Sequence, residues 1–150
     1  MARLLDSNGL YTFENVKRWS RKLSLFLMDK EFIPINVGNS HWVLLVAYIK
    51  LKKIKYYDSM GGDGKVYVDA VMRWLQDIAI HQYKFHIDVD DWSLNVEDHC
   101  PRQLNGYDCG VFTIVCADHL AAGLDLNYSQ YQMLAYRIKI GNDLIKRSIN

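Results

Sequence analysis

The spacing of apolar and polar residues along the chain predicts a mixture of strands and helices. Five short runs are continuously apolar or alternating, as strands are: residues 32–37, 41–51, 53–59, 85–89 and 92–96. A short basic turn joins the second run to the third, which predicts that they pair as antiparallel strands. In an antiparallel pair the start of one strand lies beside the end of the other, so His41 and Asp58 are expected at the same end of the sheet.

Two helices are predicted in the first half of the chain from apolar residues that recur at intervals of three and four. Residues 13–23 place Val16, Trp19 and Leu23 on one side of the first helix. Residues 67–78 repeat the same spacing and predict the second. Together with the strands, these segments give a chain of mixed α and β structure.

Two more helices are predicted near the C-terminus. Cys109–Ala122 is apolar nearly all round, which predicts a central buried helix, and Gly123 is a plausible end for it. Asn127 is a candidate cap for the last helix, with Gln130 three residues further on. The expected inward face of that helix consists of Tyr131, Leu134, Ala135 and Ile138.

Composition and charge set the class of molecule. A chain of 150 residues of which 50% are hydrophobic has the length and composition of one globular domain, residues 1–150. The net charge of +1 gives no argument for nucleic acid or for an acidic partner. No run approaches the roughly 20 apolar residues of a membrane span. We therefore expect neither nucleic acid nor a membrane as a partner.

The three cysteines do not form a zinc motif, since no second pair accompanies them. Cys116 falls inside an apolar helical run and is expected to be a buried thiol, and Cys100 to be a bystander in a loop. Free cysteines are typical of a reducing compartment, which means the cytosol or the nucleus.

The segment from Gln103 to Gly110 carries the clearest chemical signal, because it places Cys109 between a turn and the start of a predicted helix. The reactive form of cysteine is the thiolate, and a helix N-terminus favours negative charge. Cys109 is therefore a candidate nucleophile. The side-chain amide of Gln103 is a candidate oxyanion donor, paired with the backbone N–H of Cys109.

A thiol nucleophile needs a base and an orienting acid, and His41 and Asp58 are the candidates. Hydrogen bonding between them would fix the imidazole tautomer and leave the other ring nitrogen facing the thiol. His99, next to the cysteine-bearing loop, is the nearest rival as base. Other aspartates, including Asp108, are expected at solvated or turn positions without a chemical role, and the Asp108 side chain is a candidate for shaping the loop.

Four stretches, taken in order, resemble the SUMO-specific cysteine proteases of the Ulp/SENP type. They are residues 32–36, the His41-Trp42 pair, residues 56–62 and residues 103–110, with weaker likeness at 16–20. The last stretch, Q-x-N-G-x-D-C-G, is the most specific of them. The resemblance covers roughly residue 11 to the C-terminus and leaves residues 1–10 without a counterpart.

The resemblance implies a papain-like α+β fold. Its central sheet is mixed or antiparallel and flanked by helices, and the nucleophile lies at the N-terminus of a buried helix. It implies that His41, Asp58, Gln103 and Cys109 are catalytic. It also implies that Trp42 covers a narrow channel that admits only a Gly-Gly tail. Neither a metal nor an organic cofactor is expected.

The implied activity is cleavage after the C-terminal Gly-Gly of SUMO, from lysine isopeptide conjugates, from its precursor, or from both. The implied partners are SUMO or a related ubiquitin-like protein and its conjugates. A monomer in the nucleus and/or cytoplasm is expected. Catalytic domains of this family usually begin further upstream, so the chain is expected to lack their N-terminal portion. Two alternatives stay open: a clan enzyme with another task, such as a protease for another ubiquitin-like modifier, and a SUMO-binding module with little activity.

Overall fold

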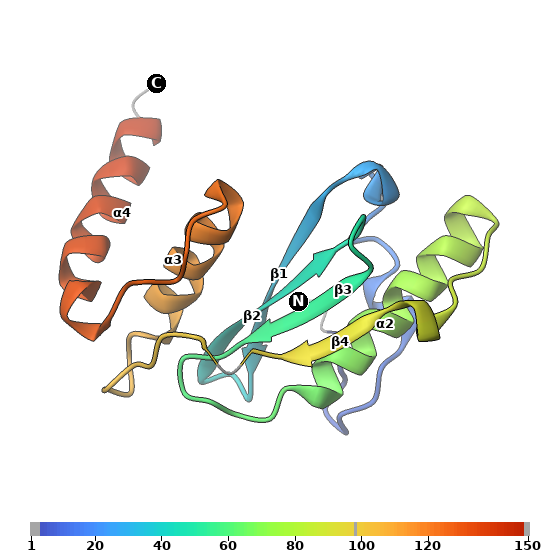
Figure 1. Cartoon of the computed structure of the whole chain (residues 1–150), viewed down its shortest axis with the longest axis horizontal. Helices are drawn as coiled ribbons and strands as arrows, with labels where there is room; N and C mark the ends of the chain where they lie inside the picture. Colours follow the sequence, from blue (N-terminus) through green and yellow to red (C-terminus); the bar gives the residue numbers. More distant parts are fainter. Residues whose placement is uncertain (1–3, 98, 149–150) are drawn as a thin grey trace.

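A four-stranded sheet runs through the centre of the computed structural model, which describes residues 4–97 and 99–148 (Figure 1). The strands are β1 (Lys30–Val37), β2 (His41–Tyr48), β3 (Lys53–Tyr57) and β4 (Ser93–Val96), in that order across the sheet. β2 pairs antiparallel with β1 and with β3, as predicted, whereas β4 is parallel to β3. The sheet is therefore mixed.

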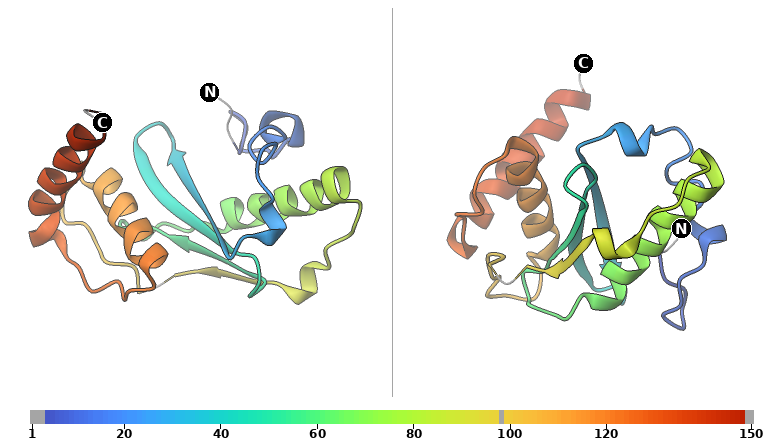
Figure 2. Two further views of the ribbon diagram at one scale, coloured as in Figure 1. Left: turned by 90° about the horizontal axis from the view of Figure 1, so that it is seen from above. Right: turned by 45° about the vertical axis from the view of Figure 1, so that its right-hand side comes forward.

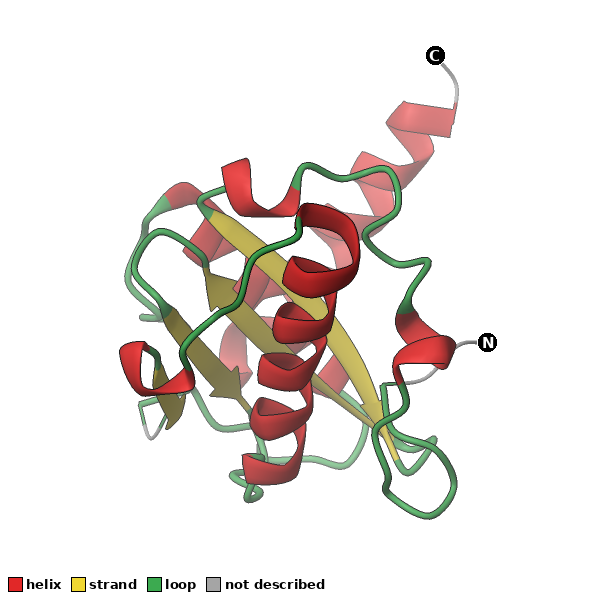
Figure 3. Ribbon diagram, turned by 90° about the vertical axis from the view of Figure 1, so that its right-hand side faces the viewer, coloured by secondary structure: helices red, strands yellow, loops and turns green. Residues whose placement is uncertain are grey.

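Helices cover both faces of this sheet (Figure 2). α2 (Lys65–Ile78) follows β3 and covers one face before the chain returns to the parallel strand β4. A view from that side shows α2 crossing the sheet (Figure 3). α3 (Cys109–Ala122) and α4 (Met133–Ser148) lie beyond the other face. The expected α+β class is confirmed.

β2 is the centre of the core, because its apolar residues are buried on both faces of the sheet. Val43 and Leu45 belong to the cluster shared with α2, whereas Leu44 and Val46 belong to the cluster shared with α3 and α4. This alternation follows from the two-residue period of a strand. The strand that begins with His41 is therefore held from both sides.

Short elements complete the described part of the chain. They are α1 (Phe13–Val16), three 3₁₀ turns (Leu25–Leu27, Val89–Asp91 and Gln130–Gln132) and a π-helical turn (Ala79–Tyr83) that continues α2. No helix within residues 4–97 and 99–148 is long and apolar enough to cross a bilayer.

The helix predicted over residues 13–23 is wrong beyond its first turn. α1 ends at Val16, and the chain continues in turns in which the Trp19 N–H bonds the Val16 carbonyl three residues back. Ser20 is fully buried and accepts a hydrogen bond from the Gln82 side chain. This tertiary contact favours turns over a short helix, which would be marginal without packing.

The strand predicted over residues 85–89 is also wrong. Its first residue, Phe85, packs edge-on against Phe26, with the ring centroids 4.9 Å apart. β4 occupies the place beside β3, so the run at 85–89 has no strand to pair with. A short alternating sequence does not reveal which of two candidates takes the edge of the sheet.

The predictions for the last two helices are wrong in detail. α3 is buried only on the side that faces the sheet and α4, and Ile114 is 50% exposed. The last helix is preceded by a capping box of Ser129 and Gln132, not by an Asn127 cap. Packing on the second cluster selects Met133, Tyr136 and Ile140 as its inner face. All four residues predicted to face inward are exposed: Tyr131, Leu134, Ala135 and Ile138.

Candidate active site

His41 and Asp58 meet at one end of the sheet, as the antiparallel register predicts. His41 is the first residue of β2, and Asp58 follows the last residue of β3, where Tyr57 pairs with Leu44. The Nε2 atom of His41 lies 2.6 Å from the Oδ1 atom of Asp58. A hairpin turn with positive φ at Gly38 and Asn39 precedes β2, and such a turn matches the twist of the paired strands.

The loop after β3 wraps around the Asp58 carboxylate. The N–H groups of Met60 and Gly62 donate hydrogen bonds to it at 2.7 and 2.9 Å, and the Tyr56 hydroxyl donates a third at 3.3 Å. A Cβ atom at position 62 would lie 2.9 Å from the carboxylate, so glycine is needed for this close approach. The glycine-rich loop therefore fixes the carboxylate that orients His41.

The environment keeps Asp58 ionised. Burial alone would raise its pKa, but hydrogen bonds from the Met60 amide, the His41 ring and the Gly62 amide outweigh burial and hold the pKa below the usual value. Because the pKa of Asp58 is lower in the folded state, its stabilising contribution is complete when the pH lies above the ordinary pKa of aspartate. That stability is lost as the pH falls through the folded-state value.

We therefore expect Asp58→Asn to lower the free energy of unfolding near neutral pH, and to lower it less as the pH falls below about 4. Urea unfolding of both proteins at pH 7, 5 and 3 measures the difference. A difference that stays constant over this range would contradict the ionised, hydrogen-bonded state of Asp58.

The second ring nitrogen of His41 is free to serve a thiol. Nδ1 is buried and has no hydrogen-bond partner in the described part of the chain. Cys109 is 6% exposed and is the first residue of α3. The indole of Trp42, the residue after His41, lies against Gly110, the residue after Cys109. A Cβ atom added to Gly110 would be 3.7 Å from Trp42 Cδ1. The start of β2 thus adjoins the start of α3. Trp42 and Cys109 line one cleft of about 680 Å³.

Gln103 is held beside the acid by Ser59, the residue after Asp58. The Ser59 hydroxyl donates to the Gln103 side-chain oxygen at 2.6 Å, and the Gln103 N–H donates to the Ser59 carbonyl at 3.0 Å. The amide nitrogen of the Gln103 side chain donates to the Asn105 carbonyl. A primary amide has two hydrogens, so one remains for an oxyanion. The sequence analysis gave Ser59 no role, although Ser59 lies within residues 56–62, one of the stretches that carry the family resemblance.

The structure also places two other residues that the sequence analysis weighed, and the choice of His41 over His99 as base stays a prediction. His99, the rival base, is exposed and lies beside Glu97. Asp108 was expected at a solvated or turn position; it lies at the turn before α3 but is not solvated. It is 4% exposed and ion-paired with Arg137 at 2.5 Å. A helix-start residue looks solvent-facing in a sequence, and a partner 29 positions away gives no local signal.

A thiol at the start of a helix, beside a histidine–aspartate pair at the end of a sheet, is the arrangement of papain-like cysteine peptidases. Within that class the chain belongs to the Ulp1 protease family. The profile of this family's C-terminal catalytic domain matches residues 6–149. The match begins five residues earlier than the resemblance predicted from the sequence.

Relatives in plants and animals agree with this assignment. The chain is 34% identical to ubiquitin-like-specific protease 1A of Arabidopsis thaliana over 96% of its own length and 29% of the relative. It is 31% identical to human sentrin-specific protease 2, over 97% of its length and 24% of the relative. The chain therefore spans about a third or less of these two relatives.

Solved structures of Ulp1 share the fold. The Ulp1 protease domain in complex with Smt3, the yeast orthologue of SUMO, matches 83% of this chain with a TM-score of 0.68 and 31% identity. The match covers 57% of that Ulp1 chain. Ulp1 with its catalytic cysteine oxidised to a sulfenic acid matches 92% of this chain, and 63% of the Ulp1 chain, with a TM-score of 0.76 and 29% identity. The resemblance predicted from the sequence is confirmed.

Proposed function

We propose that this protein is a cysteine protease that cleaves after the C-terminal Gly-Gly of SUMO, in lysine isopeptides, in the SUMO precursor, or in both. The hydrogen-bonded His41–Asp58 pair beside the cleft that contains Cys109 carries this proposal. Membership of the Ulp1 family and likeness to a Ulp1 domain bound to Smt3 support the choice of modifier.

In the proposed reaction, His41 Nδ1 accepts the thiol proton and the Cys109 thiolate attacks the carbonyl carbon of the terminal glycine. The negative oxygen of the tetrahedral intermediate accepts hydrogen bonds from Gln103 and from the Cys109 N–H. Collapse breaks the C–N bond, and His41 gives its proton to the leaving amine. Water then hydrolyses the thioester, which regenerates the thiol and releases the carboxylate.

Trp42 is proposed to select the Gly-Gly tail. Its indole lies against Gly110 and separates two clefts, one containing Cys109 and one lined by Pro34, Asn36 and Trp19. An extended tail that passes from the second cleft to the thiol must cross the indole. Glycine has no side chain, so it can approach a ring more closely than any other residue.

The Gln103 role predicts a specific kinetic defect. Gln103→Ala should lower kcat by about 10²–10³-fold with little change in KM, because an oxyanion donor acts in the transition state. Hydrolysis of a SUMO C-terminal fluorogenic conjugate measures both constants. The matched control is Gln76→Ala, since the Gln76 side chain bonds Ile87 on the α2 side of the sheet. Equal kcat for Gln103→Ala and wild type would rule out the donor role.

The same proposal includes the modifier class, the cellular location and the oligomeric state. Hydrolysis of SUMO, ubiquitin and other ubiquitin-like conjugates side by side separates a SUMO protease from one for another modifier. Binding without hydrolysis would favour a recognition module instead. Residence in the nucleus or cytoplasm is testable by imaging the tagged protein, and a monomeric state by light scattering.

A further inference from the structure

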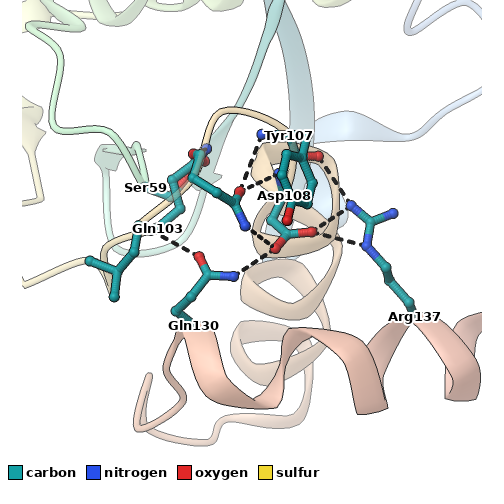
Figure 4. Close-up of polar contacts among 8 residues, drawn as sticks. Ser59, Gln103, Tyr107, Asp108, Gln130 and Arg137 are labelled. Atoms are coloured by element: carbon teal, nitrogen blue, oxygen red, sulfur yellow. Dashed lines mark hydrogen bonds and ion pairs between the residues drawn. The ribbon is translucent and has the colours of Figure 1, made fainter.

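The loop that precedes the nucleophile is tied to α4 through the buried carboxylate of Asp108 (Figure 4). Arg137, on α4, donates from Nε and Nη2 to Asp108 Oδ1 at 2.9 and 2.5 Å. The side-chain amides of Gln130 and Asn105 donate to Oδ2 at 2.6 and 2.7 Å. The same Arg137 nitrogen, Nη2, also donates to the Tyr107 carbonyl at 3.1 Å.

The Asp108 carboxylate does not cap the helix that it precedes. Asp108 is the N-cap residue of α3, where an aspartate commonly accepts a bond from the first turn, yet its side chain makes no such bond. It turns instead toward the segment around α4. Burial alone would raise the pKa of Asp108, but the bonds from Asn105, Arg137 and Gln130 outweigh burial and lower it, so the group is a carboxylate.

The network reaches both halves of the proposed oxyanion hole. Asn105 Oδ1 accepts from the N–H groups of Tyr107 and Asp108, and the Asn105 carbonyl accepts from the Gln103 side chain. On the other side, Asp108 is bonded to Cys109 in the chain. The Cys109 N–H is the first of α3 and has no partner within the helix. Asn105 and Asp108 therefore connect the two donors.

We propose that Arg137 is a positioning residue for catalysis, which fixes the loop of residues 103–108 and so sets the direction of the two oxyanion donors. Gln130 acts with it, since its side-chain oxygen also accepts from the Leu104 N–H at 2.8 Å. This inference rests on the proposed function for its catalytic readout, because it assigns Arg137 no contact with the reacting atoms. A shift of about 1 Å in such donors can cost about 10²-fold in rate.

The test compares Arg137→Met, Arg137→Lys and Lys139→Met with wild type in the full chain. Lys139 is a matched control, because it is an exposed cation on the same helix and pairs with Asp143 outside the network. Four quantities are measured: kcat and KM on a SUMO conjugate, the rate of Cys109 alkylation by iodoacetamide, and hydrogen exchange of the amides in residues 104–108. Alkylation needs the thiolate but no oxyanion hole, so it separates positioning from collapse of the site.

For Arg137→Met we expect kcat to fall by about 10–100-fold with the alkylation rate near wild type. Arg137 also lines the cleft that contains Cys109, so a rise in KM is expected beside the fall in kcat. Exchange of the loop amides should become faster. Arg137→Lys should recover only part of kcat, because an ammonium cannot reproduce the planar fork that holds both Asp108 and the Tyr107 carbonyl. Lys139→Met should resemble wild type in every measurement.

Wild-type kcat and wild-type loop exchange in Arg137→Met would overturn the inference. Parallel loss of kcat and of alkylation would also overturn it, since the whole site would then have collapsed. If wild type cleaves no modifier conjugate but Arg137→Met still exchanges its loop amides faster, the proposed function fails while the control of the loop by Arg137 stands.

Discussion

Replacement of Cys109 by alanine is expected to abolish turnover, with a loss on the order of 10⁶ in kcat, as when other hydrolases lose their nucleophile. The thiol touches only the scissile carbonyl in the proposed reaction, whereas Trp42 and the rest of the cleft hold the tail. Binding of the modifier should therefore persist in Cys109→Ala. Single-turnover hydrolysis and a binding titration with the same SUMO conjugate measure the two effects separately.

Cys116→Ala is the matched control for this variant. Cys116 lies two turns further along α3, is 2% exposed and belongs to the core cluster, not to the cleft. Its replacement removes a buried thiol and should leave kcat near wild type. Substantial hydrolysis by Cys109→Ala, or equal loss in the two variants, would show that Cys109 is not the nucleophile.

Replacement of His41 by alanine should lower kcat by about 10²–10⁴-fold, the usual contribution of a general acid–base group. The loss should extend to alkylation by iodoacetamide, because Nδ1 is the atom proposed to accept the thiol proton. This response differs from that expected of Arg137→Met, where alkylation persists. Stopped-flow hydrolysis and the alkylation rate at one pH distinguish the two.

His99→Ala provides the comparison for His41→Ala. His99 is exposed and precedes the Gln103–Gly110 stretch with three residues between them, and its backbone N–H donates to the Glu97 carboxylate. We expect its replacement to leave both rates unchanged. Loss of activity in His99→Ala with activity retained in His41→Ala would show that His99, and not His41, is the general base.

The central part of the fold was predictable because strand patterns and local order act over short distances. The apolar run of β2 and its antiparallel pairing with β3 follow from the sequence, and the pairing brings His41 within 2.6 Å of Asp58. The start of α3 at Cys109 was likewise predictable, since the Asn-Gly turn precedes an apolar run. These features together bring the candidate base, acid and nucleophile to one end of the sheet.

The parts that could not be predicted depend on contacts between distant segments. The burial of Asp108 requires Arg137 and Gln130, which lie 29 and 22 positions further along the chain. The inner face of α4 depends on how that helix lies against the second core cluster, because apolar residues occur around its whole circumference. The choice of β4, and not residues 85–89, as the strand beside β3 likewise depends on contacts between distant segments.

Incubation with a SUMO C-terminal vinyl-sulfone probe, beside a ubiquitin probe and the Cys109→Ala variant, tests the central claim most directly. The proposal predicts one covalent adduct with the SUMO probe, none with the ubiquitin probe, and none in Cys109→Ala. The mass of the adduct-bearing peptide should place it on Cys109. Absence of an adduct with the SUMO probe, or an adduct that persists in Cys109→Ala, would contradict the assignment.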